Sequence, residues 1–518
     1  MPVLTGIDVL GIQRYVFASN RLRDAVSASW LVHWATASDG ALAESGGDLF
    51  QASGGSAILR FADETRAREF AGKYTRRLYD QAPGLEVAVA HRAYAPDELA
   101  SAIERVQVDL AVAKLERAPS APQLGLSVTA PCRISGLPAS GLDPQDPTVS
   151  LSRLVLRWRD RSVQEEATGR WNAFFAGTAG WAFAPEIDDM GRTRGETSLV
   201  GMVHLDGNGV GQQITSWLRR CVDAGRSDDA VRSNLTEWSS VLGHLGERSL
   251  RSVVARVTRA VQEDDNEPRL LGAVADLVFA LRHSGENVLL PIRPVLLGGD
   301  DLTFLCDGRI ALDLAETALD AFNAEVPHLG HVTACAGVAI VPAHTPFDRA
   351  YALAETLCGN AKRRRREKND GGSWVDWHIG APRPGEGVGD LRARAYSHPL
   401  SGTSLELTCR PYPLGTHADD PGTWRWLSQS VLGTRPGGFR GEQWRQHHNK
   451  LKELASAVRE GKDGVRRTRE GWTAAAGLHW PDGLDQNNGF IDGLRTPLLD
   501  AVELLDIHLP LTEEADAR

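Results

Sequence analysis

Three acidic residues at two glycine-containing turns are the side chains of this sequence best suited to chemistry. Asp300 and Asp301 follow Gly298 and Gly299 between two apolar stretches, and Asp206 ends another apolar stretch. Adjacent carboxylates can hold hard cations against a triphosphate, and glycines let a nucleotide approach the backbone. This pattern indicates a metal site. The alternatives are a hairpin whose turn needs only positive φ angles and, for Asp206, a helix N-cap.

The strands and helices that must position these residues are expected in a definite order. They are a strand at 199–206, a hairpin at 294–305, a strand at 331–340 and an amphipathic helix at 346–362. Gly207 and Asn208 form a tight turn after the first strand, and Lys362 ends the last helix. In a βαββαβ unit the first strand lies beside the hairpin, so Asp206 would face the acidic pair and complete a two-cation site.

Between the first strand and the hairpin, the sequence pattern is helical. It predicts helices over 249–261 and 270–283, within a helical insertion at about 212–285.

The first ninety residues repeat the same plan. We expect a strand at 6–13, a hairpin at 49–61, a helix at about 64–81 and a strand at 85–90. Asp8 lies in the first strand, and the hairpin turns at Gly54 and Gly55. Ser56 is expected to stand where Asp300 stands in the second copy, so the first copy would lack a metal ligand and Asp8 would be structural. The glycine turn could still receive a nucleotide.

Together these parts resemble the palm domain shared by GGDEF nucleotide cyclases and by the large polymerase-like subunit of type III CRISPR effector complexes. Two palms in one chain favour the CRISPR subunit, because a diguanylate cyclase carries one palm and dimerises. The resemblance covers about residues 1–395 and is strongest over 196–380. It implies an α+β fold with two ferredoxin-like palms.

The resemblance also implies a division into four parts. They are a degenerate first palm at 1–125, a small linker domain at 126–195, a second palm at 196–395 and a helical C-terminal domain at 396–518. Cys132 resembles the remnant of a zinc module found in many relatives, but a lone cysteine binds no structural zinc. The sequence has no His-Asp dipeptide, so the DNA cleavage associated with the nuclease domain of relatives is not expected.

The resemblance implies a nucleotidyltransferase that joins ATP into cyclic oligoadenylates with release of pyrophosphate. Two Mg²⁺ or Mn²⁺ ions would be held by three carboxylates, those of Asp206, Asp300 and Asp301. The expected nucleotide-binding residues of the second palm are Gly207, Asn208, Gly298, Gly299 and Lys362, the last of which contacts phosphate in these families. Gly54, Gly55 and Ser56 of the first palm would hold the acceptor nucleotide.

Composition bounds the partners and the location. The chain has 518 residues, of which 42% are hydrophobic and 24% charged, and a formal net charge of −10. An acidic chain does not grip nucleic acid along a broad face, so other effector subunits would carry the guide RNA, and target RNA would act indirectly. No signal pattern or membrane-length apolar run is present, which predicts a cytoplasmic location without a membrane partner.

Two other functions remain open from the sequence. One is a GGDEF-like cyclic dinucleotide synthase that uses GTP, and the doubled palm counts against it. The other is a non-catalytic scaffold of a guide-RNA ribonucleoprotein. Three crowded carboxylates count against the scaffold, because their repulsion costs stability without cations. The base preference and ring size of the product are not encoded in these motifs.

Overall fold

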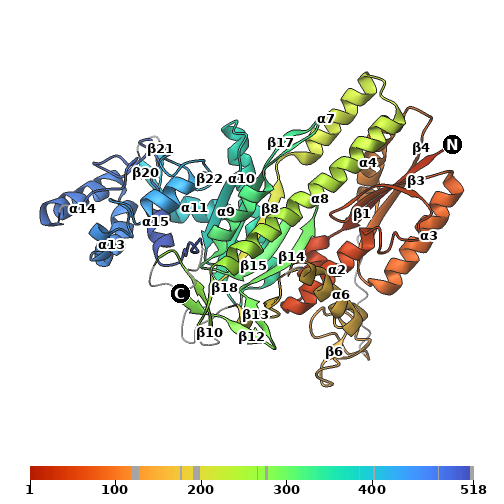
Figure 1. Ribbon diagram of the computed structural model, residues 1–518, viewed down its shortest axis with the longest axis horizontal. Helices are drawn as coiled ribbons and strands as arrows, with labels where there is room; N and C mark the ends of the chain where they lie inside the picture. Colours follow the sequence, from red (N-terminus) through yellow and green to blue (C-terminus); the bar gives the residue numbers. More distant parts are fainter. Residues whose placement is uncertain are drawn as a thin grey trace.

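The computed structural model describes residues 1–117, 128–175, 178–190, 199–264, 267–274, 278–383, 385–400, 403–476 and 478–513. The molecule is elongated, with the N-terminal sheet at one end and the C-terminal helices at the other (Figure 1). Helices and strands are both abundant, as an α+β fold requires. In the described part, no helix combines the length and the apolar character that crossing a membrane needs.

The first palm is a four-stranded antiparallel sheet with the order β2-β3-β1-β4. Its strands are β1 (Val3–Leu10), β2 (Asp48–Ser53), β3 (Ser56–Phe61) and β4 (Glu86–Ala93), and its main helices are α2 (Leu22–Thr36), α3 (Glu64–Gln81) and α4 (Leu99–Glu116). A Cβ atom on Gly6 would lie 2.7 Å from Leu110 Cδ1, so glycine at this position of β1 lets α4 pack against the sheet. The predicted hairpin, helix and last strand of this copy are confirmed. The predicted first strand at 6–13 ends at Leu10, because Ile12 begins the short helix α1 (Ile12–Val16).

The second palm repeats this sheet and extends it. Its strand order is β14-β15-β8-β18-β19-β22, of which the first four correspond to β2, β3, β1 and β4. The strands are β8 (Leu199–Gly207), β14 (Ile292–Gly298), β15 (Asp301–Asp307), β18 (Ala334–Pro342), β19 (Trp374–Ile379) and β22 (Tyr412–Pro413). A Cβ atom on Gly337 of β18 would lie 1.9 Å from the Ala354 carbonyl oxygen, so glycine permits the close packing of α10 (Phe347–Glu367).

Long helices connect the two palms. After β8 the chain forms α7 (Val210–Asp223) and then α8 (Asp228–Arg259), which contacts both β2 of the first palm and α9 (Ala311–Phe322) of the second. Figure 1 shows α8 running past both sheets. The predicted helix at 249–261 is confirmed as the end of α8.

The predicted helix at 270–283 is wrong. The described residues there form β10 (Glu267–Leu271), β11 (Val278–Ala280) and β12 (Arg282–Ser284), whereas 275–277 lie outside the described residues. Buried Pro268 and Leu270 alternate with exposed residues along β10, which is the period of a half-buried strand. The helical part of the insertion therefore ends at Arg259.

The remaining segments are the linker, which packs against the first palm, and the C-terminal region. The linker includes α5 (Arg153–Trp158) and α6 (Arg161–Asn172), and α6 packs against α2 of the first palm. The C-terminal region includes α13 (His448–Arg459), α14 (Gly461–Ala476) and α15 (Leu498–Leu505). Its tryptophans are buried, and the rings of Trp444, Trp472 and Trp480 pack together in pairs about 6 Å apart. These side chains form an aromatic core of the C-terminal region.

Candidate active site

Strand register brings the predicted carboxylates together. Asp301 opens β15 and lies directly opposite Asp206 on β8. Asp300 occupies the turn before β15, where its carbonyl oxygen accepts a hydrogen bond from the Gly207 backbone nitrogen at 3.2 Å. A Cβ atom on Gly207 would lie 2.8 Å from the Asp300 Cβ, so only glycine leaves room for this aspartate. The three carboxylates thus converge at one end of the sheet.

The local electrostatics disfavour three ionised carboxylates. Burial raises the pKa of Asp301 well above its ordinary value, and the neighbouring Asp300 and Asp206 raise it further. Burial and then Asp206 also raise the pKa of Asp300. Although protein atoms surround the Asp301 side chain, it is exposed to water through a cavity that it lines. Cations bound here would relieve the repulsion, and oxygen-only donors are the ligands that Mg²⁺ and Mn²⁺ prefer.

Lys362 occupies the position that the sequence predicts, beside the carboxylates. Its Nζ forms an ion pair with Asp206 and donates a hydrogen bond to the Gly207 carbonyl oxygen at 2.7 Å. Lys362 therefore links α10 to the turn after β8. It does not end the helix as predicted, because α10 continues to Glu367. Asn208 shapes the same turn, because its backbone nitrogen and its amide Nδ2 both donate to Thr333, at 2.7 and 2.9 Å.

A basic cavity of about 400 Å³ adjoins this turn. Its lining residues include four cations and no acidic side chain: Asn208, Gly209, Gln212, Gln213, Ser216, Arg220, His328, Leu329, Lys362, Arg365 and Arg366. At the end of α10, Arg363 and Arg364 pair with Glu367, whereas Arg365 and Arg366 line the cavity.

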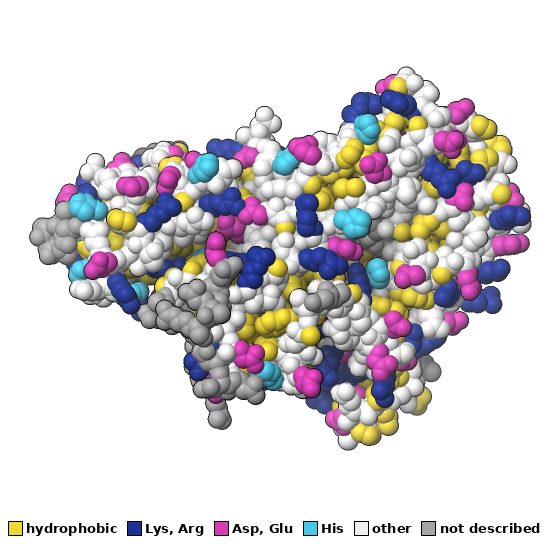
Figure 2. Space-filling view, in the orientation of Figure 1, with side chains coloured by type: hydrophobic (Ala, Val, Ile, Leu, Met, Phe, Trp, Pro, Cys, Tyr) yellow, Lys and Arg dark blue, Asp and Glu magenta, His cyan; other side chains and the backbone are white. Residues whose placement is uncertain are grey.

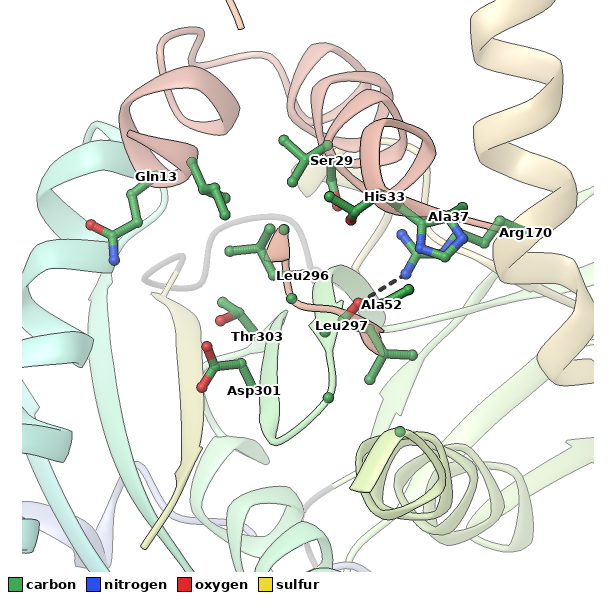
Figure 3. A pocket seen from close by; sticks show the side chains of 18 of the residues that line it. Gln13, Ser29, His33, Ala37, Ala52, Arg170, Leu296, Leu297, Asp301 and Thr303 are labelled. Carbon is green, nitrogen blue, oxygen red and sulfur yellow. Dashed lines mark hydrogen bonds between the residues drawn. The ribbon is translucent and has the colours of Figure 1, made fainter. Parts of the chain in front are cut away.

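A second cavity, of about 290 Å³, lies between the two palms. Gly54 and Gly55 line it from the first palm, and Gly298, Gly299 and Asp301 line it from the second. Figure 3 shows that its walls come from segments far apart in sequence, with Ser29 and His33 on one side and Thr303 and Asp301 on the other. The cavity therefore joins the glycine turn of the first palm to a carboxylate of the second.

The two glycine turns touch each other directly. A Cβ atom on Gly298 would lie 2.7 Å from the Gly54 Cα, and one on Gly54 would lie 3.3 Å from the Gly298 carbonyl oxygen. The backbones of the two palms are thus in contact where the cavity begins.

The position of Ser56 differs from the expectation. Ser56 pairs with both Ser53 and Asp8, as Asp301 pairs with both Gly298 and Asp206. Ser56 is therefore the counterpart of Asp301 and not of Asp300, whose counterpart is Gly55. The reason is the turn, which consists of two glycines in the first palm but of Gly299 and Asp300 in the second.

The first palm has its own polar cluster at this place. Ser56 Oγ donates a hydrogen bond to Asp8 Oδ1 at 3.0 Å, and Lys114 of α4 forms an ion pair with the other Asp8 oxygen. Ser56 does not line the cavity between the palms, whereas Gly54 and Gly55 do.

Several lining residues could not be found from the sequence. Arg170 of α6 donates a hydrogen bond to the Leu297 carbonyl oxygen at 2.9 Å, beside the acidic turn (Figure 3). Burial, and then the charge of nearby Arg170, lower the pKa of His33 to about 4. Gln13 donates to Glu355 Oε1 at 2.8 Å and so links the first palm to α10. His33 and Arg170 lie in helices without any local motif, and Gln13 lies in α1, at the end of the segment predicted as a strand. Tertiary packing brings all three to the site.

The chain is similar to a known domain family and to several solved structures. Residues 199–370 match the family model described as the second palm domain of Cas10/Cmr2. A chain of a Csm1–Csm4 cassette in complex with cA4 is similar to this one with a TM-score of 0.53 and 14% identity, over 97% of this chain and 70% of that chain. No curated protein matches the chain in sequence.

Two further structures have the same fold. Csm1 in T. onnurineus gives a TM-score of 0.52 and 14% identity over 97% of this chain and 69% of that chain. The apo Csm1–Csm4 cassette gives 0.51 and 13% over 97% and 70%. At such identities the similarity establishes the fold, and the predicted α+β fold with palm domains is confirmed.

Proposed function

We propose that this chain, whose residues 199–370 are a Cas10/Cmr2 second palm domain and whose fold is that of Csm1, joins ATP molecules into cyclic oligoadenylates within a type III CRISPR effector complex. The observation that carries the proposal is the convergence of Asp206, Asp300 and Asp301 between a basic cavity and a cavity shared with the first palm. The similar Csm1–Csm4 cassettes were crystallised with cA4, cA3 and ATP, which supports the substrate class.

In this mechanism the donor nucleotide lies across the turn after β8. Its phosphates enter the basic cavity, where Lys362, Arg220 and Arg366 offset their negative charge. Lys362 exchanges its contact with Asp206 for a phosphate oxygen. Gly209 and Gln212 at the start of α7 line the same cavity, and a helix N-terminus favours an anion.

Asp206, Asp300 and Asp301 would hold two Mg²⁺ or Mn²⁺ ions, and these ions polarise the α-phosphate and neutralise the leaving pyrophosphate when bound. The all-oxygen donor set and the raised pKa values of two of its members fit such ions. The protein contributes position: Gly207 and Asn208 fix the turn, and the β8–β15 register fixes the distance between the carboxylates.

The acceptor nucleotide would lie in the cavity between the palms, against the Gly54–Gly55 turn. Its 3′-hydroxyl oxygen attacks the α-phosphate of the donor and a P–O bond forms. The O–H bond breaks with its proton passing to solvent, and the bond to the leaving pyrophosphate breaks. Binding both nucleotides across one interface supplies much of the rate acceleration, because a bimolecular reaction becomes effectively unimolecular.

Other subunits would bring the RNA. On the face shown in Figure 2, basic and acidic side chains are interspersed rather than gathered into a stripe. With a net charge of −10, the chain suits a subunit that responds to guide and target RNA held mainly by its partners. We therefore expect little product from the purified chain alone, and much more when it joins an effector complex engaged with a target transcript.

The test uses the full chain, alone and with effector subunits, incubated with each labelled nucleoside triphosphate and Mg²⁺ or Mn²⁺. Cyclic oligoadenylate from ATP, absent in the Asp300→Ala/Asp301→Ala variant, would support the proposal. Cyclic dinucleotide from GTP would favour the cyclase alternative, and no product under any condition would favour the scaffold.

A further inference from the structure

A mixed set of metal ligands lies directly behind the acidic site. One ring nitrogen of His204, the Sγ of Cys358 and a carboxylate oxygen of Asp206 all lie within 4.8 Å of one another. His204 and Asp206 project from the same face of β8, two residues apart, and Cys358 faces them from α10. Neither His204 nor Cys358 has a role in the proposed nucleotide chemistry.

The surroundings of His204 prepare it to bind a cation. Its Nδ1 contacts Thr303 Oγ1 at 2.9 Å, which leaves Nε2 as the nitrogen able to bind. A hydrogen bond that fixes one ring nitrogen is the usual partner arrangement of a metal-bound histidine. The Tyr351 ring lies edge-on against the imidazole, with centroids 5.3 Å apart, and limits its rotation. His204 also lines the cavity between the palms, so ions can reach it from solvent.

Cys358 approaches from the opposite side. It is buried one helical turn before Lys362, and its thiol donates a hydrogen bond to the Cys335 carbonyl oxygen at 3.2 Å. Cys335 lies opposite Asp206 in the β8–β18 pairing. The helix thus presents two groups to Asp206, the Lys362 ammonium, which contacts it in the structure, and the Cys358 thiol.

We propose that His204, Asp206 and Cys358 form a second cation site, selective for a borderline-soft divalent ion of the Zn²⁺ or Co²⁺ class. Nitrogen and sulfur donors favour such ions, whereas the all-oxygen set of Asp206, Asp300 and Asp301 favours Mg²⁺ or Mn²⁺. Three protein ligands leave a fourth position for water.

Metal binding at this site releases one proton and two contacts. The metal–sulfur bond forms as the Cys358 S–H bond breaks, and the proton goes to solvent. The thiolate gives up its hydrogen bond to the Cys335 carbonyl, and the Lys362 ammonium leaves the Asp206 carboxylate. The ion replaces the positive charge of Lys362 beside Asp206, so this half-buried carboxylate keeps a cationic partner.

The two sites share Asp206, so their occupancies compete. An ion held by His204 and Cys358 pulls Asp206 away from Asp300 and Asp301 and weakens the binding of Mg²⁺ there. Zn²⁺ would therefore inhibit nucleotidyl transfer in the presence of Mg²⁺. This inhibition rests on the proposed function, whereas the binding itself does not.

The deciding measurement is Co²⁺ titration of the full chain, followed by near-ultraviolet absorption. Cobalt bound to a thiolate gives a charge-transfer band, which we expect in the wild type and in Cys221→Ser, a control for a buried cysteine of α7 remote from the carboxylates. The band should disappear in Cys358→Ser. No band in the wild type, or an unchanged band in Cys358→Ser, overturns the site.

A second variant guards against misfolding. His204→Gln keeps all cysteines and should weaken Zn²⁺ binding, measured by equilibrium dialysis, by more than about tenfold, the least that loss of even an outer partner costs. Unchanged affinity in a folded His204→Gln protein contradicts the proposal. Both readouts involve no nucleotide, so they decide the cation site even if the chain synthesises nothing.

Discussion

The two palms share a scaffold and differ at two positions of one turn. Both have the same strand order, and both hairpins carry a bulge at the corresponding place, between Leu49 and Gln51 and between Pro294 and Leu296. In both palms, a lysine of the helix after the fourth strand forms an ion pair with the aspartate of the first strand.

At the turn itself, Ser56 and Gly55 stand where the second palm has Asp301 and Asp300. If the proposed metal site is correct, the capacity to bind cations would depend on these two side chains, whereas the aspartate and the lysine belong to both palms. Asp8 with Lys114 is a polar cluster satisfied within the protein, and Asp206 with Lys362 is the same pair placed beside two further carboxylates.

The largest effect should follow removal of the acidic turn. In Asp300→Ala/Asp301→Ala we expect cyclic oligoadenylate synthesis by the assembled complex to fall by more than about 100-fold. Loss of residues that bind the metal directly should cost more than loss of a residue that only hydrogen-bonds to a metal ligand, which costs about 10- to 100-fold. The fold should persist, since a turn position opens no core cavity. Separation of labelled products measures the loss.

The control for that experiment lies in the first palm. Ser56→Ala should reduce synthesis only a few-fold, because Ser56 contacts Asp8 rather than the cavity between the palms. Equal losses in the two variants would mean that the metals belong to the other palm, and unchanged synthesis in the double variant would remove the metal site altogether.

The paired lysines give the next largest contrast. Lys362→Ala should lower kcat/KM for ATP by about tenfold to a hundredfold, the range of a charged hydrogen bond of about 1.5–3 kcal/mol. Lys114→Ala should change it by less than about threefold. Steady-state kinetics on both variants decides, and similar values would show that the counterpart lysines act alike.

Cation-dependent stability should also separate the palms. At a Mg²⁺ concentration 100 times its Kd, the wild type should gain about 2.7 kcal/mol of unfolding free energy, and Ser56→Ala should gain as much. Asp301→Ala should gain much less. Thermal melting with and without Mg²⁺ measures this, and an unchanged gain in Asp301→Ala would place the ion elsewhere.

The smallest effect is expected at Asp8. Asp8→Asn should lower the unfolding free energy by about 1 kcal/mol or less, because the Lys114 contact is largely exposed and the Ser56 hydrogen bond can re-form with the amide oxygen. Its Mg²⁺-dependent gain should match the wild type. A reduced gain in Asp8→Asn would contradict the structural role of this carboxylate.

Local patterns made the core of the site predictable. Asp206, Asp300 and Asp301 stand at turns between apolar strands, and β-strand periodicity with glycine turns fixes such elements within a few residues. The order of those elements then placed Asp206 opposite the hairpin. The helix α3, predicted from about residue 64 to 81, begins and ends at those residues.

Other features depend on information that local sequence lacks. The predicted counterpart of Ser56, Asp300, is one residue away from the observed counterpart, Asp301. The sequence does not show which glycine begins each two-residue turn, and only the pairing of Ser56 with Asp8 of β1 fixes it. The strands β10, β11 and β12 are short, and the periodicity of a short apolar run does not distinguish a strand from a helix. Arg170 and His33 reach the site because α6 packs on α2. No sequence motif near either residue predicts this packing.

The contact between Gly54 and Gly298 limits how far the two repeats can diverge. A methyl group at Gly298 would collide with the Gly54 backbone, a neighbour that cannot rotate away as a side chain can. A side chain at either position would therefore force the two backbones apart, so we expect both positions to require glycine. The contact between the palms thus constrains the backbone at these two glycines, whereas the neighbouring turn residues are free to carry different side chains.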